Sequence, residues 1–263
     1  MKSVIALIVS LFLLISCSKE YKYAYWVNGH LGWNVEWIVN DQPALIAFSS
    51  GASKEITPFL VPGNNTIIVR GIKQTEDEYD FDISLKRVNE NNYEDTIKLG
   101  ELVSRNKENS FEIIVTSTLP EWTWNKSDEI TTLSDNDVNE IYTIIKKFHQ
   151  IFSLKDYKLI DSFEWYPWAI DESKNERLET ILPRAWASKV MEAEDFDSLK
   201  LDFDSIKLFA GKNIVKAYAK NSLGIINAGD GGVEKVQRLL SENLISFPDL
   251  YFIKMNGKWA MLL

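Results

Sequence analysis

The feature that most constrains the fold is a series of short, strand-like segments between about residues 24 and 120, separated by turn-forming residues. These segments are 35–39 (VEWIV), 44–48 (ALIAF), 66–69 (TIIV), 81–85 (FDISL) and 111–115 (FEIIV). In 81–85 apolar and polar side chains alternate, as they do in a strand with one buried face. Short segments rich in β-branched residues and bounded by Gly, Pro and Asn predict an all-β sandwich, jelly-roll or immunoglobulin-like, over 24–120.

One stretch of this region carries a more specific pattern. Residues 55–70, EITPFLVPGNNTIIVR, resemble the "ITxxLxPGxNxIxVR" segment of galactose-binding-like β-sandwich domains, and residues 38–41 loosely resemble the "VNG" turn of that family. The resemblance implies a jelly roll, a fold often appended to glycoside hydrolases. The pattern itself is structural, because Pro62-Gly63 supplies a tight turn and the apolar residues bury between sheets. It supports a fold and carries no sugar site.

The pattern changes after Pro120. Residues 121–133 are predicted to connect two domains, and Ser134 with Asp137 at capping-box spacing predicts the start of a helix. From 138 to 152 apolar residues recur every three or four positions, which is typical of one buried helix face. The sequence predicts further helices from about 153 to the residue before Pro167, from about Pro183, and over about 233–244.

Strand-like segments return near the C-terminus, at 201–209, 214–220, 250–255 and 258–263. Asn256-Gly257 lies between the last two, and Asn-Gly is a strong hairpin signal. Helices followed by antiparallel strands that end in FIKMNGKWAML resemble the NTF2-like (SnoaL-like) fold, in which helices pack against a curved antiparallel sheet shaped like a cone. The helix expected over 233–244 departs from the usual pattern of that family. An α+β domain is therefore expected over 134–263.

The N-terminal segment predicts export. Lys2 is followed by an apolar run that ends at Cys17, the only cysteine in the sequence. About twelve helical residues rise about 18 Å, well short of a hydrocarbon core of about 30 Å, so a signal peptide fits better than a spanning helix. Residues 14–17, Leu-Ile-Ser-Cys, resemble the lipobox of bacterial lipoproteins. This resemblance implies a signal peptide over 1–16, lipid attachment at Cys17 and a lipidated tether over 17–23.

The same resemblance implies a location and a partner. A lipidated cysteine carries several acyl chains, palmitate among them, which anchor a protein stably in a membrane. By resemblance to Gram-negative lipoproteins, Ser18 in place of Asp favours the outer membrane, on its periplasmic or cell-surface side. The net charge of −9 and the lack of a Lys/Arg run argue against a nucleic-acid partner.

The sequence gives no motif for a metal, a cofactor or a catalytic nucleophile. The only histidines, His30 and His149, fall in different predicted domains, whereas transition-metal sites need clustered ligands. The acidic run 76–82 has oxygen ligands suited to calcium but is more typical of a solvated loop. No G-x-S-x-G elbow occurs. We therefore expect neither a metal nor a cofactor.

Aromatic residues supply the candidate ligand site. Trp165, Tyr166 and Trp168 lie near the end of an expected helix, where an NTF2-like cone would open, and Trp186 lies in the same domain. Exposed aromatic faces stack on sugar rings, while buried ones supply apolar packing, and the sequence leaves both interpretations open.

The leading functional hypothesis is noncatalytic binding of an envelope protein, a glycan or a small molecule. One alternative is a hydrolase or isomerase whose NTF2-like pocket uses Glu164 or Asp171 as a base. Another is a structural spacer or assembly subunit. A carboxylate in a closed pocket would favour the enzyme, and an exposed apolar patch would favour a protein partner.

Overall fold

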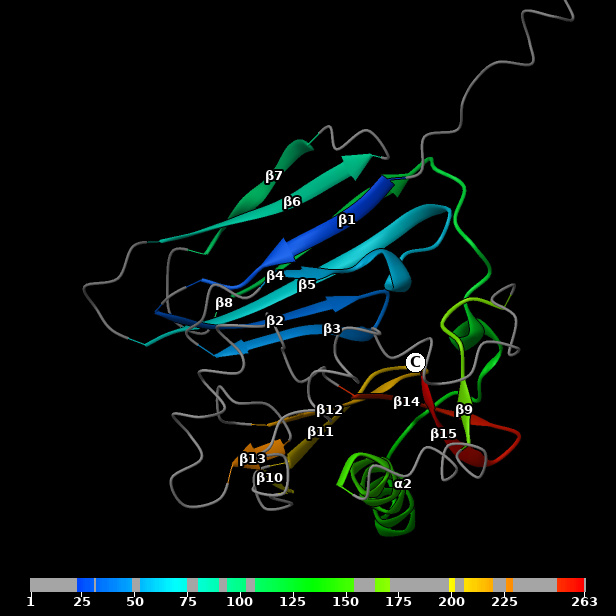
Figure 1. Cartoon of the computed structure of the whole chain (residues 1–263). Coiled ribbons are helices and arrows are strands. Elements are labelled where there is room, and N and C mark those ends of the chain that lie inside the picture. The colour runs from blue at the N-terminus through cyan, green and yellow to red at the C-terminus, as the bar shows by residue number, and fades with distance from the viewer. Residues whose placement is uncertain are drawn as a thin grey trace, which may run out of the picture.

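The computed structural model of the chain describes residues 23–30, 32–48, 53–74, 80–89, 94–102, 107–153, 164–170, 199–201, 206–219, 226–228 and 250–262. Over these residues the protein is rich in antiparallel β-structure and has one α-helix, α2. This confirms the β-rich part of the predicted fold. The N-terminal sheets lie above the C-terminal sheet in the view of Figure 1, and α2 lies below it.

Eight strands form the N-terminal part of the molecule. They are β1 (Tyr23–Asn28), β2 (Trp33–Val39), β3 (Gln42–Phe48), β4 (Ser53–Glu55), β5 (Gly63–Lys73), β6 (Phe81–Asn89), β7 (Glu94–Leu102) and β8 (Lys107–Val115), with a 3₁₀ turn, η1 (Thr57–Phe59), after β4. They pair into two four-stranded antiparallel sheets, in the orders β4-β1-β6-β7 and β3-β2-β5-β8. We call the second the β5 sheet. Each predicted strand segment lies inside one of these strands.

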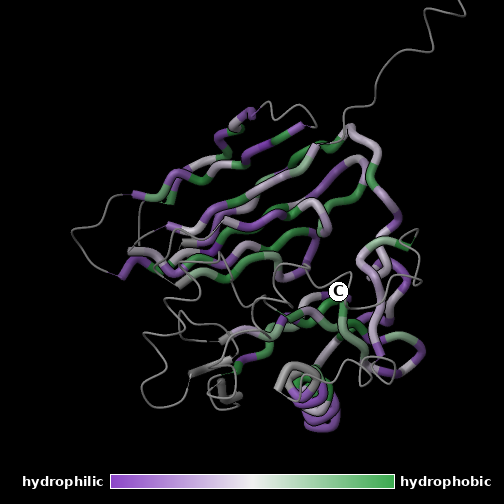
Figure 2. The backbone as a smooth tube through the Cα atoms, in the orientation of Figure 1, coloured by the Kyte–Doolittle hydropathy of each residue, from purple (hydrophilic) through white to green (hydrophobic). Residues whose placement is uncertain are grey.

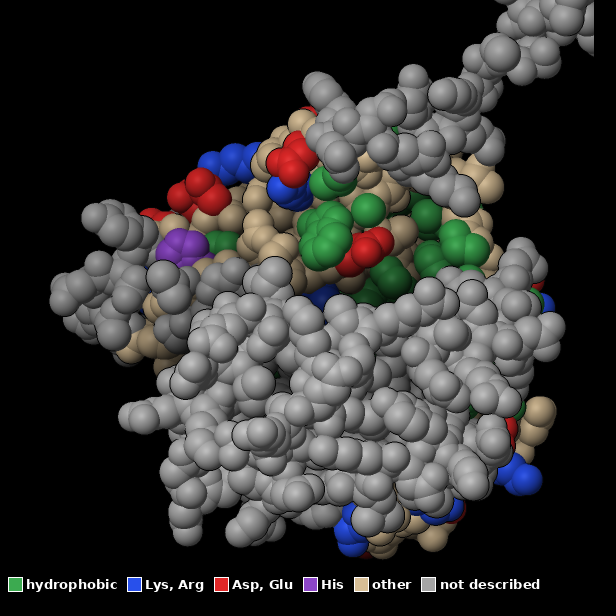
Figure 3. Space-filling model, in the orientation of Figure 1, with side chains coloured by type: hydrophobic (Ala, Val, Ile, Leu, Met, Phe, Trp, Pro, Cys, Tyr) green, Lys and Arg blue, Asp and Glu red, His purple; other side chains and the backbone are tan. Residues whose placement is uncertain are grey.

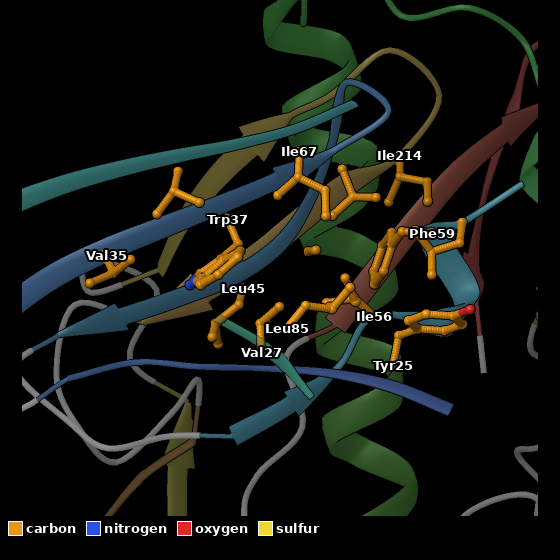
Figure 4. Packing of buried hydrophobic residues seen from close by; sticks show 14 of the residues in the cluster. Tyr25, Val27, Val35, Trp37, Leu45, Ile56, Phe59, Ile67, Leu85 and Ile214 are labelled. Carbon is orange, nitrogen blue, oxygen red and sulfur yellow. The ribbon is translucent and has the colours of Figure 1, made fainter. Parts of the chain in front are cut away.

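The two sheets pack face to face over a shared apolar core. Alternate residues of β2 are fully buried, among them Val35 and Trp37, and hydrophobic and hydrophilic residues alternate along the tube of Figure 2. Figure 4 shows these side chains pointing toward Val27 and Leu85 of the opposite sheet. Ile214, which belongs to the C-terminal part, joins the same buried cluster. The core of the N-terminal sheets therefore continues into the rest of the molecule.

The C-terminal part is built around a five-stranded sheet. Its elements are α2 (Asp135–Ser153), β9 (Trp165–Tyr166), β10 (Leu199–Leu201), β11 (Ile206–Ala210), β12 (Val215–Ala219), β13 (Ile226–Ala228), β14 (Leu250–Met255) and β15 (Lys258–Leu262). The sheet order is β11-β12-β14-β15-β9, and β10 pairs separately with β13. The predicted Asn256-Gly257 hairpin is confirmed, since β14 and β15 pair in antiparallel fashion and both turn residues have positive φ, 52° and 79°.

Two details of the predicted C-terminal part are wrong. The sequence predicts a helix up to Tyr166, but Trp165 and Tyr166 form β9, which pairs with β15 in parallel rather than antiparallel fashion. Pro167 gives a reason, because a residue before proline avoids the helical region. The strand predicted over 201–209 is divided between β10 and β11, which pair with different partners. The helices predicted near 183 and over 233–244, and most of the one from 153, lie outside the described residues.

The predicted capping box at the start of α2 is confirmed. The backbone N–H of Ser134 donates to Asp137 Oδ2 at 3.0 Å, and the N–H of Asp137 donates to Ser134 Oγ at 3.2 Å. Asp137 Oδ1 also accepts from Lys254 Nζ at 2.7 Å and Trp259 Nε1 at 2.8 Å, both on the terminal hairpin. The Lys254 ammonium and these hydrogen bonds hold the pKa of Asp137 well below its ordinary value. One carboxylate thus fixes the helix start to the last two strands.

The segment after β8 packs tightly against the N-terminal sheets. Trp122 and Trp124 are buried, and their indole N–H groups donate to the carbonyl oxygens of Leu60 at 2.6 Å and Pro58 at 2.8 Å. The backbone N–H of Thr123 donates to the carbonyl of Trp168 at 2.8 Å. The residues predicted to connect two domains therefore form a packed layer between the two parts of the molecule.

Candidate functional site

Two hairpin turns dock on each other where the two parts meet. The β2–β3 turn, Asn40-Asp41, has positive φ at both residues, and the Asp41 carbonyl accepts from the backbone N–H of Lys212 in the β11–β12 turn at 2.9 Å. Gly211 permits this approach, because a Cβ there would lie 2.5 Å from the Asp41 oxygen. Buried Gln42 accepts from the N–H groups of Asn213 at 3.1 Å and Ile214 at 3.0 Å. These contacts hold the two turns in one arrangement.

The C-terminal part also covers an edge strand. β3 is the outer strand of the β5 sheet, and its Ala44 carbonyl accepts from Tyr251 Oη at 2.8 Å and Lys216 Nζ at 3.3 Å. Lys216 is fully buried, and its ammonium lies 5.3 Å from the centre of the Tyr251 ring. Edge strands invite pairing with other chains, and covering this one removes that possibility. The edge strand is therefore buried inside the molecule.

An open groove of about 510 Å³ lies beside the docked turns, and we call it the junction groove. The outer face of the β5 sheet, the segment before α2, and β11 with its following turn all contribute to its lining. The lining residues are Ile38, Asp41, Ile68, Arg70, Glu129, Ile130, Phe209, Ala210, Gly211 and Lys212. Three regions distant in sequence thus assemble one concave surface.

Charged side chains line the groove together with the apolar ones. Arg70 Nε donates to Glu108, and Arg70 Nη1 lies 4.0 Å from Glu36, with all three side chains between two-fifths and just over one-half exposed. Exposed pairs of this kind add little to stability, so they mainly set the charge of the surface. Burial, followed by the nearby Glu36 carboxylate, raises the pKa of Tyr218 on β12. Phe209 and Lys212 line the groove beside Ile68, so the C-terminal part reaches over this face of the sheet.

The outer face of the β5 sheet continues beyond the groove. Along β5, Ile68, Arg70 and Ile72 follow one another on this face, because alternate residues of a strand point the same way. Ile72 is 50% exposed, and Ile114, on β8 opposite Asn64, is 72% exposed. They are the large hydrophobic side chains with high exposure in the described part of the chain.

Of the aromatic residues predicted to bind a ligand, Trp165, Tyr166 and Trp168 are described, and none of these three lines the junction groove. Trp168 makes edge-to-face contacts with Phe59, at 5.4 Å between ring centres, and with Tyr251, at 5.2 Å. Such contacts are typical of packing. Trp165 and Tyr166 are half-buried on β9, at the edge of the five-stranded sheet.

Cys17 and Trp186 lie outside the described residues, as does Asp171. Burial and the neighbouring Glu164 raise the pKa of Tyr166, and Glu164 itself is exposed. The ligand site at Trp165, Tyr166, Trp168 and Trp186 therefore stays a prediction.

No sequence motif marks the groove residues as a site. The sequence of β2 contains one indication of this surface. Its alternation of apolar and polar residues ends at three consecutive apolar residues, Trp37, Ile38 and Val39. A strand that is apolar on both faces is expected to be covered on both. That signal indicates a second contact surface but not the side chains that complete it, such as Phe209.

In the described ranges no helix is long and apolar enough to cross a membrane. Within the same ranges no group of three or more His, Cys, Asp or Glu side chains is placed to hold a metal ion. Comparison with family models, curated proteins and solved structures gives no match. Function is therefore inferred from the junction groove and its surroundings.

Proposed function

We propose that the protein is a noncatalytic binding protein of the cell envelope, anchored in the outer membrane by lipid on Cys17. In this proposal the junction groove and the adjoining face of the β5 sheet bind a partner in the envelope. We also propose two domains, a jelly-roll-type sandwich over 24–120 and an NTF2-like domain over 134–263. The two facing sheets support the first, and α2 packed on a sheet that ends in a hairpin supports the second.

The observation that carries the binding proposal is the make-up of the groove. It is open to solvent and is lined by both apolar and charged side chains from three regions of the chain. Small-molecule sites usually enclose most of their ligand, so an open groove better suits part of a larger partner. Ile72 and Ile114 add two exposed aliphatic side chains to the same face of the sheet, outside the groove.

The alternatives have less support. An enzyme with a carboxylate base needs that group in a sheltered pocket, but Glu164 is exposed, and the other predicted base, Asp171, lies outside the described residues. A structural spacer needs no concave surface assembled from three regions of the chain, whereas this protein has the junction groove. These observations favour binding over both.

Replacing the predicted lipidation residue tests the anchor. We expect Cys17→Ala to abolish incorporation of labelled palmitate and to leave a precursor of higher mass, because the thiol is the acceptor in lipoproteins with a lipobox. Metabolic labelling followed by immunoprecipitation measures this, with Ser16→Ala as the control that keeps the thiol. Palmitate incorporation that persists in Cys17→Ala would contradict the proposal.

Photo-crosslinking tests whether the groove is occupied in the cell. We expect p-benzoylphenylalanine at position 130, in the groove, or at position 114, on the exposed face, to form a discrete adduct in intact cells. The control is the same substitution at Thr96, an exposed residue of β7 on the other sheet. Equal adducts at all three positions, or none at 114 and 130, would contradict the binding site.

A further inference from the structure

Carboxylates outnumber cations over the groove and the outer face of the β5 sheet taken together, although the groove lining alone has two of each sign. Arg70 and Lys212 are the cations there. The carboxylates that line the groove or point outward on the neighbouring strands are Glu36, Asp41, Glu108, Glu112 and Glu129. A partner of the same sign would be repelled, so the surface favours a cationic one.

Existing ion pairs strengthen this preference. Arg70 already lies between Glu108 and Glu36, so its charge is largely balanced within the protein. Among the residues that the structure describes, Asp41, Glu112 and Glu129 have no ion-pair partner. Asp41 and Glu129 both line the groove. Lys212 is the cation of the groove lining outside the Arg70 pairs, so Asp41, Glu112 and Glu129 outnumber it and leave negative charge available to pair with a cation brought by a ligand.

The same surface also carries apolar side chains that a partner could contact. Ile68, Ile130 and Phe209 are only partly buried, and all three face the groove. Ile114 and Ile72 lie near the two ends of β5, and the eight residue steps from Asn64 to Ile72 span about 26 Å. An extended polypeptide places alternate side chains on one face over such a length.

From these observations, and resting on the function proposed above, we infer that the partner is a polypeptide segment carrying Lys or Arg beside aliphatic side chains. The aliphatic groups contact the isoleucines and Phe209, and the cations pair with Asp41 and Glu129. A neutral glycan would leave the excess of carboxylates over Lys212 without a counter-charge. An anionic segment would be repelled by them.

Fluorescence anisotropy with a short fluorescein-labelled peptide of alternating Leu and Lys tests this inference on the full mature chain. We expect the combined substitution Asp41→Asn and Glu129→Gln to weaken binding by about fivefold to tenfold, as the loss of two exposed charge pairs allows. Asn is compatible with the positive φ of residue 41, so the variant should keep the turn. Glu129→Gln alone, expected to weaken binding by about threefold, serves as a second variant.

The matched control is Asp82→Asn with Glu101→Gln, two exposed carboxylates on the opposite sheet. It changes the net charge equally, and we expect binding to stay within about twofold of the unmodified protein. Equal weakening in both double variants, equal binding of a Leu–Glu peptide, or no binding of the Leu–Lys peptide would overturn the inference. Crosslinks at 114 and 130 would then show that the groove binds a partner of other chemistry, while their absence would overturn the proposed function as well.

Discussion

Trp122→Ala is expected to lower the free energy of unfolding by about 3–5 kcal/mol, the usual cost of truncating a buried large aromatic side chain. Trp122 is 6% exposed, and its indole N–H donates to the Leu60 carbonyl in the layer between the two parts. The truncation leaves a cavity and an unsatisfied carbonyl together. Urea unfolding followed by tryptophan fluorescence and by circular dichroism measures the loss.

Two further variants separate the causes. Trp122→Phe keeps most of the volume but removes the donor, and we expect a loss of about 1–3 kcal/mol from the unpaired Leu60 carbonyl. Trp26→Ala is the matched control, since Trp26 is half-buried on the outer face of β1, and we expect a loss of about 1 kcal/mol. A loss in Trp122→Ala no larger than in the Trp26 control would contradict the packed layer.

The same measurement addresses how the two parts unfold. Because one buried cluster contains residues from both, we expect the fluorescence and circular dichroism transitions of Trp122→Ala to coincide. Two separate transitions, only one of them shifted, would indicate domains that unfold independently.

Asp137→Ala is expected to lower the free energy of unfolding by about 2–4 kcal/mol at neutral pH. The substitution removes the capping box and leaves Lys254 and Trp259 without their acceptor, and hydrogen bonds to charged groups contribute about 1.5–3 kcal/mol each. The side chain of Lys254 is 29% exposed, so water compensates part of the loss. Asp135→Ala, in the same helical turn but exposed, is the control, with an expected loss below about 1 kcal/mol.

The effect of Asp137 should depend on pH in a defined direction. The pKa of Asp137 in the folded protein lies below the ordinary value of 3.8. The contribution of Asp137 to the free energy of unfolding is therefore fully present above pH 3.8 and is lost as the pH falls toward the pKa of the folded state. We therefore compare the free energy of unfolding of the unmodified protein with that of Asp137→Ala. We expect the difference between the two to stay constant from pH 7 down to about pH 5 and to shrink below about pH 4. A difference that grows on acidification would contradict this account.

Local patterns in the sequence predicted the elements with strong local signals. The alternation in 81–85 lies within β6, Ser134 caps α2, and Asn256-Gly257 turns between β14 and β15. In each case the deciding interactions link residues close in sequence, so propensity and pattern suffice. Strands with weaker signals were missed. β7, for example, has the mostly polar sequence EDTIKLGEL and lies at the edge of its sheet, where few positions are buried.

The junction groove could not be predicted in the same way. It depends on contact between Ile38, Ile130 and Phe209, which are 92 and 79 positions apart in the chain, and no local periodicity encodes contacts at that separation. The ligand site predicted in the stretch 163–168 was based on its aromatic composition alone. Trp168 packs against Phe59 and Tyr251, which are also far from it in sequence.

The cover over β3 has a consequence for how the chain reaches its folded state. Ala44 and Tyr251 are 207 positions apart, so the N-terminal sheets cannot protect this edge until almost the whole polypeptide is available. Closing so long a loop costs only slightly more entropy than closing a short one, but it delays the contact. If the chain is exported as proposed, the β3 edge of the β5 sheet stays exposed during that interval and can pair with strands of other chains. Slow export, or truncation of the chain before β14, would therefore favour aggregation over folding of the N-terminal sheets alone. A chaperone that binds the unfolded chain would be most useful before β14 is available to fold.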